Sequence, residues 1–137
     1  MVRGRVLVAG EAEGPFVRLR APISFWGGVD PATGRVADPR HPDHGLSLAG
    51  AVLLVPEAVG SSSSSAIMLE LLRGGVAPAA VLMGRADAIL ALGVVVAREL
   101  GHPTIPVLEV GVEELASVEE GACLRVNADG RIGAHRE

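Results

Sequence analysis

The sequence is poor in aromatic side chains. Aromatic residues make up 2% of the 137 residues and tyrosine is absent, although hydrophobic residues make up 49%. The core must therefore be built from aliphatic side chains. A chain of this length is expected to form one domain, here residues 1–137, which buries about two thirds of the surface that its unfolded form exposes.

Cysteine is almost absent. The one cysteine, Cys123, makes no disulfide within the chain and cannot by itself hold an iron–sulfur cluster or a zinc ion. It stands in an alternating run, residues 122–126, that predicts a strand. Because free cysteines are commonly buried, we expect Cys123 to be a small buried residue.

Long hydrophobic runs and an excess of positive charge are also missing. The formal net charge is −4, and no basic block or aromatic stacking platform points to nucleic acid. No apolar run approaches the roughly 20 residues that span a bilayer, so we expect no membrane partner. The first residues lack the apolar stretch of a signal peptide, and we expect a cytoplasmic protein.

Glycine and proline are the residues in excess, with 18 and 9 copies. They indicate tight turns between apolar runs. Helical and alternating periodicities then predict a regular series of elements. It comprises a first strand at 3–8 with its partner at 16–19, a long ordered loop at 22–49, strands at 51–55, 79–83 and 105–110, helices at 66–72, at 87–100 with a break at Gly93, and at 112–116, and a closing hairpin of 123–126 with 131–134.

This alternation predicts an α/β fold with a mainly parallel sheet, flanking helices and an antiparallel C-terminal hairpin. Ligands of such sheets sit beyond the carboxyl ends of the strands. The loops that follow Val55 and Met83 are therefore the places where we expect a binding site.

The loop after Val55 is the most unusual segment, because Gly60 is followed by five serines. The first N–H groups of a helix have no internal partner and carry a partial positive charge. A loop at this position can bind a carboxylate or a phosphate, and its N–H groups favour the alkoxide form of a serine. Serine is also a favoured helix cap, so capping alone remains a second interpretation.

Two better-known motifs are excluded for this loop. It lacks the Gly-Lys-Ser/Thr of a phosphate-binding P-loop. It also lacks the second glycine of a Gly-x-Ser-x-Gly nucleophile elbow.

A second unusual segment, residues 22–34, holds the only tryptophan, Trp26, and one of the two phenylalanines beside Gly27 and Gly28. These glycines allow a positive φ or a close approach of the backbone. One interpretation is a turn pinned by a hydrophobic plug. The other is a loop that closes over a substrate or packs on a partner chain.

The run His-Pro-Asp-His at 41–44, after Asp38, mixes ligand types on a loop without helical spacing of the histidines. We expect no metal site there, and favour either a hydrogen-bonded loop or a loop that orients residues 24–30. Three arginines could each help to bind an anion, namely Arg35, Arg73 and Arg85. Arg73 is the weakest candidate because it lies at the far end of the helix that the serines open.

Several of these strings together resemble the small subunit of aconitase X. The resemblance runs in order over about residues 9–110. It rests on Ser-Phe-Trp-Gly-Gly-Val-Asp-Pro at 24–31, His-Gly at 44–45 with Leu-Ala-Gly at 48–50, Gly-Ser-Ser-Ser at 60–63 and Gly-Val-Ala-Pro-Ala at 75–79. The first string is highly specific.

The resemblance implies a swivelling β/β/α domain and a hydro-lyase, which eliminates water from a small hydroxy acid. It implies that the Gly-Ser-Ser loop supplies a serine base, here Ser61, with Ser62 as the second choice. The residues that it places at the substrate are Gly60, Ser63, Ser24, Trp26, Gly27, Gly28 and Asp30.

The resemblance also implies a large catalytic subunit whose cysteines hold an iron–sulfur cluster, with none bound by this chain alone. The cluster would be the Lewis acid for the leaving hydroxyl, while Ser61 as alkoxide removes the proton from the neighbouring carbon. Activities in the family include dehydration of 5-phosphomevalonate and of cis-3-hydroxy-L-proline, and the residues do not choose between them.

Two departures from the family patterns concern anion binding. Ordinary aconitases have Arg and Glu after the two serines, where this chain has Ser63 and Ser64. Aconitase X chains often have Gly-Arg-Gly before the serines, where this chain has Ala58-Val59-Gly60. The substrate-binding arginine is therefore expected from elsewhere, namely from a partner chain. The alternative function is a non-catalytic, regulatory swivel module that binds a small anion.

Overall fold

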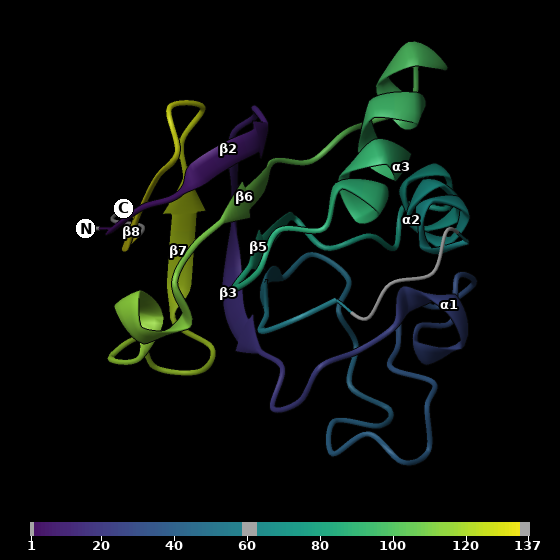
Figure 1. Cartoon of the computed structure of the whole chain (residues 1–137), viewed down its shortest axis with the longest axis horizontal. Coiled ribbons are helices and arrows are strands. Elements are labelled where there is room, and N and C mark those ends of the chain that lie inside the picture. The colour runs from purple at the N-terminus through teal and green to yellow at the C-terminus, as the bar shows by residue number, and fades with distance from the viewer. Residues whose placement is uncertain (1, 59–62, 135–137) are drawn as a thin grey trace.

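The computed structural model describes residues 2–58 and 63–134. Its sheet has the strand order β1-β8-β7-β3-β4-β5-β6-β2, and the three α-helices lie to one side of it (Figure 1). The elements in chain order are β1 (Val2–Arg3), β2 (Arg5–Val8), β3 (Ala12–Arg18), α1 (Phe25–Gly28), β4 (Val52–Val55), α2 (Ser64–Arg73), β5 (Ala80–Met83), α3 (Ala88–Glu99), β6 (Val107–Glu109), the 3₁₀ helix η1 (Val112–Leu115), β7 (Cys123–Val126) and β8 (Arg131–Ala134).

The predicted α/β fold is confirmed, with a sheet that is parallel only in part. Strands β3, β4, β5 and β6 pair in parallel, because α2 and α3 return the chain to the same end of the sheet between strands. Strands β7, β8, β1 and β2 pair antiparallel. The predicted closing hairpin of β7 and β8 is confirmed.

Strand β3 belongs to two sheet layers. Its first half pairs with β7, with Ala12 opposite Val126, and its second half pairs with β4, with Phe16 opposite Val52. The chain can therefore build a layer of β1, β8 and β7 against the layer of β4, β5, β6 and β2.

The predicted pairing of the first strand with residues 16–19 is wrong. Strand β2 pairs with β6, at the opposite end of the strand order from β1. Gly4 makes this switch possible, because a Cβ there would lie 2.7 Å from Val110 Cγ2 and 2.9 Å from Leu108 Cδ2. Alternation in the sequence predicts a strand but does not specify its partner.

Two apolar cores lie on the two faces of the parallel strands. Because side chains alternate along a strand, Leu53 and Val55 of β4 face α2 and α3, while Val52 and Leu54 face the β7 and β8 layer. This produces three layers, β/β/α, as the family resemblance implied. The cores are aliphatic apart from the two buried phenylalanines, Phe16 and Phe25.

Helix α3 begins, and helix α2 ends, where the capping residues predict. Asp87 Oδ1 accepts hydrogen bonds from the N–H groups of Ile89 (2.9 Å) and Leu90 (3.4 Å) at the start of α3. Helix α2 ends at Gly74, whose N–H donates to the Glu70 carbonyl oxygen at 2.9 Å. No helix among the described residues is long and apolar enough to cross a membrane.

The predicted break at Gly93 is wrong, since α3 is continuous from Ala88 to Glu99. Gly93 is buried where α3 meets α2, and a Cβ there would lie 2.5 Å from the Ser65 carbonyl oxygen and 2.9 Å from Met68 Cβ. The glycine therefore permits close helix packing rather than interrupting the helix.

The predicted burial of Cys123 is also wrong, because its side chain is exposed. Strand β7 does alternate as expected, but Leu124 and Val126 take the buried face. Cys123 shares its face with Arg125, which pairs with Glu11 and Glu13 at the surface.

Candidate functional site

The two unusual segments of the sequence lie side by side. Ile23 forms a parallel bridge with Ala58, and its N–H donates to the Glu57 carbonyl oxygen at 3.1 Å. Residues 57 and 58 follow β4 and lead to the glycine-serine loop. The start of the tryptophan segment is therefore an extra strand partner for the chain that enters this loop.

The predicted residues Gly60, Ser61 and Ser62 lie outside the described residues. Ser63 is described and is the N-cap residue of α2. Helix α2 has no acidic residue in its first turn, so no carboxylate there neutralises the positive end of its dipole.

Ser64, the first residue of α2, was not among the predicted site residues. It is 2% exposed, and its Oγ is buried with no hydrogen-bond partner among the described residues. A buried hydroxyl without a partner destabilises a fold by about 1–3 kcal/mol. Helix capping therefore does not explain why this position is a serine.

The backbone of the tryptophan segment places its two aromatic side chains in different environments. Phe25 is 1% exposed and plugs the core, while Trp26 is 57% exposed. Gly27 has φ of 79° and interrupts the helical geometry of α1, a conformation that favours glycine. The hydrophobic plug is thus Phe25, and Trp26 is free to contact a substrate or a partner chain.

Two open hollows lie on either side of Trp26 and Gly27. The first has a volume of about 490 Å³ and the second of about 530 Å³. Of the predicted substrate residues, the structure brings five to these hollows, namely Ser24, Trp26, Gly27, Gly28 and Asp30. Ile67 of α2 also lines the second hollow, which joins the tryptophan segment to the helix that the serines open.

Arg40 lines the first hollow, and the sequence analysis missed it. Its backbone N–H donates to Asp38 Oδ1 at 2.9 Å and its Nε at 3.4 Å. The backbone N–H is the main cause that holds the pKa of Asp38 below its ordinary value, with the Arg40 side chain assisting and burial opposing. An ionised Asp38 thus holds Nε and leaves the Nη groups toward solvent.

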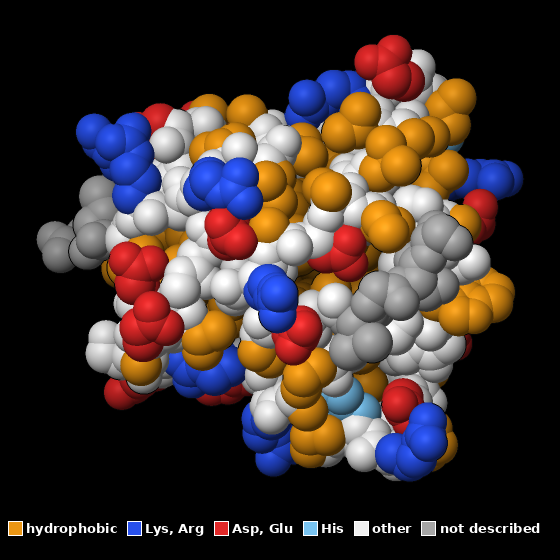
Figure 2. Space-filling model, in the orientation of Figure 1, with side chains coloured by type: hydrophobic (Ala, Val, Ile, Leu, Met, Phe, Trp, Pro, Cys, Tyr) orange, Lys and Arg blue, Asp and Glu red, His pale blue; other side chains and the backbone are white. Residues whose placement is uncertain are grey.

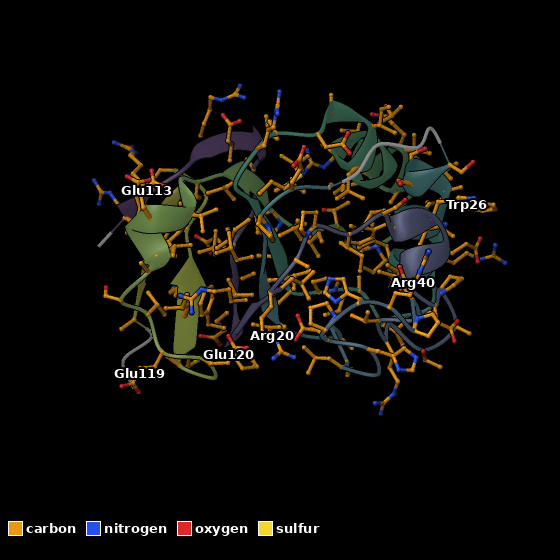
Figure 3. All side chains as sticks on the ribbon, turned by 60° about the horizontal axis from the view of Figure 1, so that its bottom comes forward. Arg20, Trp26, Arg40, Glu113, Glu119 and Glu120 are labelled. Atoms are coloured by element: carbon orange, nitrogen blue, oxygen red, sulfur yellow. The ribbon has the colours of Figure 1, made fainter. Side chains whose placement is uncertain are left out.

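Figure 3 shows Trp26 and Arg40 at the end of the molecule that α1 forms, while Glu113 and Glu119 lie at the other end. Arg40 therefore places its positive charge at the first hollow, away from these labelled glutamates. The Asp-Pro-Arg string at 38–40, in which the aspartate accepts from the N–H two residues on, was the signal that could have identified Arg40.

The three arginines named from the sequence have partners within the chain. Arg35 Nη1 donates to the Gly45 carbonyl oxygen at 2.9 Å, and Arg73 pairs with Glu70 at 3.4 Å. Arg85, which follows β5, pairs with Glu57 at 3.9 Å. Among these, Arg85 is nearest in sequence to a loop at the carboxyl edge of the sheet.

The loops after β4 and β5, where the sequence analysis expected a binding site, contact each other. The Gly84 N–H donates to the Val55 carbonyl oxygen at 2.9 Å, and a Cβ at Gly84 would lie 2.6 Å from the Pro56 carbonyl oxygen. Glu109 of β6 holds the loop after β5 two residues further on, since its Oε2 accepts from the Ala86 N–H at 2.9 Å. This hydrogen bond is the main cause that lowers the pKa of Glu109, with Arg5 adding to it.

His41 and Asp43 form the base of the long loop. The Asp43 N–H donates to His41 Nδ1 at 3.0 Å, so Nε2 carries the proton toward the Ala21 carbonyl oxygen at 3.1 Å. The Asp43 carboxylate accepts from the Arg20 N–H at 2.8 Å and from its Nε at 2.7 Å. The interpretation as a hydrogen-bonded loop is confirmed.

Nearly the whole chain matches one family model. The family model described as the aconitase X swivel domain matches residues 1–134. This chain belongs to the aconitase X swivel domain family.

Members of this family occur both inside long chains and as separate subunits. A cis-3-hydroxy-L-proline dehydratase of Pseudomonas aeruginosa is 43% identical over 135 residues, which are 97% of this chain and 23% of that protein. A phosphomevalonate dehydratase small subunit of Thermococcus gammatolerans is 38% identical over 128 residues, which are 93% of this chain and 92% of that subunit. The chain thus spans less than a quarter of the first relative.

A solved structure of the family has the same fold. The crystal structure of Thermococcus kodakaraensis aconitase X in its holo-form superposes with a TM-score of 0.85 at 34% identity, over 98% of both chains. The three-layer arrangement of this aconitase X swivel domain is therefore that of the family.

This aconitase X swivel domain has no described residues that fit an iron–sulfur cluster. Within residues 2–58 and 63–134, no three or more His, Cys, Asp or Glu side chains group so that they could hold a metal ion. The one cysteine stands on the surface of β7.

Proposed function

We propose that this chain is the small subunit of an aconitase X-type dehydratase, a hydro-lyase that eliminates water from a small hydroxy acid in the cytoplasm. Both 5-phosphomevalonate and cis-3-hydroxy-L-proline are candidate substrates. The bridge between Ile23 and Ala58 carries the proposal. It sets the segment of Ser24 and Trp26 beside the chain that leads to the serines, as one composite site needs.

In this proposal Ser61 is the base, with Ser62 as the second candidate. The base must take a proton from the carbon next to the leaving hydroxyl. The N-terminus of α2 supports the alkoxide form, because the positive end of the helix dipole favours negative charge and no acidic residue lies in the first turn. We assign the binding of the acidic group of the substrate to Ser63, the N-cap residue of α2, and to Gly60.

The tryptophan segment and Arg40 bind and orient the substrate in this proposal. Arg40 pairs with an acidic group of the substrate through its Nη groups, in the geometry that suits carboxylate and phosphate. Ser24, Gly27 and Gly28 line the same hollow. Trp26 covers it from the side and excludes water when the large subunit is in place.

The site is incomplete on this chain, and we assign the rest to a large subunit. The described residues do not fit an iron–sulfur cluster, so we place the cluster on that subunit. The length of the first relative supports this division, because this domain makes up only 23% of it.

The test is co-purification with the large chain that matches the remainder of the single-chain relatives, followed by assays of both candidate substrates for loss of one water. Ser61→Ala should leave the complex intact and reduce turnover at least roughly a thousandfold, while Ser117→Ala on the exposed turn after η1 serves as the matched control. Near-normal turnover of Ser61→Ala removes this residue as the base. A wild-type complex that binds the acids without turnover supports the non-catalytic alternative.

A further inference from the structure

Helix α3 has an apolar face in solvent. Its exposed large apolar side chains include Leu92 (51%) and Leu100 (60%, the residue after the helix), and Figure 2 shows apolar side chains gathered over this part of the surface. We call the set the α3 stripe. It consists of Ile89, Leu92, Val95, Val96 and Leu100.

The stripe is not part of the core of this chain. The opposite face of α3 already packs on the sheet and on α2 through other residues, including Leu90, Val94 and Ala97. No charged residue occurs in α3 before Arg98. An ordinary surface helix carries charged and polar residues on its solvent side, so α3 is built to be covered on both faces.

Other exposed apolar residues do not form a comparable set. Among the described residues, the remaining large ones are Trp26, Leu46 and Val112, each on a different segment. Single exposed apolar residues are normal at a surface, whereas a contiguous set marks an interaction site.

We infer that the α3 stripe is the surface on which the large subunit docks, an inference that rests on the proposed function. The position of α3 supports this occupant. The close contact of Gly93 with Ser65 fixes α3 to the first turn of α2, and α2 lies between α3 and α1 in Figure 1. A partner that contacts both the stripe and Trp26 would therefore span the helix that the serines open.

The length of the single-chain relative favours the large subunit, and not a second copy of this chain, as the partner that covers the stripe. The domain makes up 23% of the single-chain relative, so a much larger body accompanies it there. The stripe also offers no charged side chain of its own with which to specify a self-complementary pairing. Interfaces of permanent complexes are more apolar than those of transient complexes. The side chains of the α3 stripe are all apolar, as suits a permanent interface.

The test compares binding of the full chain to the large subunit without substrate, by titration, for wild type, Leu92→Glu and Leu100→Glu. The control is Leu46→Glu, an exposed leucine in the long loop. We expect both stripe variants to weaken binding at least roughly tenfold, with an unchanged thermal unfolding midpoint of the small chain. The control should bind like wild type.

Stripe variants that bind as tightly as wild type overturn the inference. So does a wild-type chain whose self-association is lost in Leu92→Glu while its binding to the large subunit is unchanged. The proposed function fails separately. A wild-type complex that forms through the stripe but releases no water from either acid contradicts the dehydratase assignment and leaves the interface standing.

Discussion

The N–H of Ile23 donates to the carbonyl oxygen of Glu57 at 3.1 Å. This hydrogen bond joins two segments that are separated by the whole long loop. It ties the start of the tryptophan segment to the entry of the glycine-serine loop. A site shared by the two segments therefore depends on this backbone pairing.

Arg40→Gln should raise KM for the substrate by about tenfold or more and change kcat less. The variant removes a charge-assisted pair with the acid group, worth roughly 1.5–3 kcal/mol. Glutamine keeps the backbone N–H that Asp38 accepts, so the loop should hold its shape. The measurement is steady-state kinetics of the two-subunit enzyme.

Arg73→Ala is the matched control for Arg40, because Arg73 lies at the far end of α2 and pairs only with exposed Glu70 at 3.4 Å among the interactions described. Its KM should equal that of wild type. An equal rise in KM for both variants would mean that general charge, and not the hollow beside Trp26, attracts the substrate.

Gly93→Ala should destabilise the chain by about 1–3 kcal/mol. Alanine in a helix is favoured over glycine by up to about 1 kcal/mol, but here its Cβ would meet the Ser65 carbonyl oxygen at 2.5 Å. A backbone atom cannot move aside cheaply, so the clash outweighs the propensity. Urea unfolding measures the change, with exposed Val95→Ala as the control.

Gly93→Ala should also lower turnover of the complex, because the clash displaces the first turn of α2. A variant as stable as wild type or more stable would contradict the close packing of α2 and α3.

Asp43→Ala should destabilise the chain by about 1–3 kcal/mol. The Asp43 carboxylate is buried and accepts two hydrogen bonds from Arg20, which lose their acceptor in the variant. Glu70→Ala breaks an exposed pair with Arg73 and should stay within about 0.5 kcal/mol. Thermal unfolding of both variants gives the comparison, and equal effects would show that the loop base contributes nothing beyond surface charge.

Glu109→Gln should reduce the stability of the chain at neutral pH and lose that effect in acid. The Ala86 N–H and Arg5 favour the ionised carboxylate and lower its pKa in the folded state below the ordinary 4.5. A lowered folded pKa contributes stability above the unfolded pKa, and this contribution is lost as pH falls through the folded pKa. The difference between wild type and variant should thus be constant from pH 7 to about 5.5 and shrink below 4.5.

Urea unfolding at a series of pH values tests this dependence. Glutamine can still accept from the Ala86 N–H, but its single carbonyl oxygen cannot also accept from Arg5 Nε, so the variant removes the charge together with one hydrogen-bond acceptor. A difference that does not change between pH 7 and pH 3 would falsify the assignment of the lowered pKa to Glu109.

Local signals in the sequence predicted most elements correctly. Asp87 and Gly74 mark helix ends because capping depends on residues within one turn. The segment of Ser24 and Trp26 and the serines after Gly60 were found by their composition alone. The break at Gly93 failed because the sequence does not show that another helix lies against that glycine.

By itself, the sequence determined where strands, helices and turns form, because period and capping act over a few residues. Only the tertiary structure decided which strand β2 pairs with, which face of β7 exposes Cys123, and that Arg40 joins Ser24 at one hollow. These depend on contacts between residues far apart in the chain, and local periodicity leaves both the partner of a strand and the buried side of a strand open. The described part of this chain does not cover the apolar solvent face of α3. The role of this face therefore depends on a partner chain, which we infer to be the large subunit.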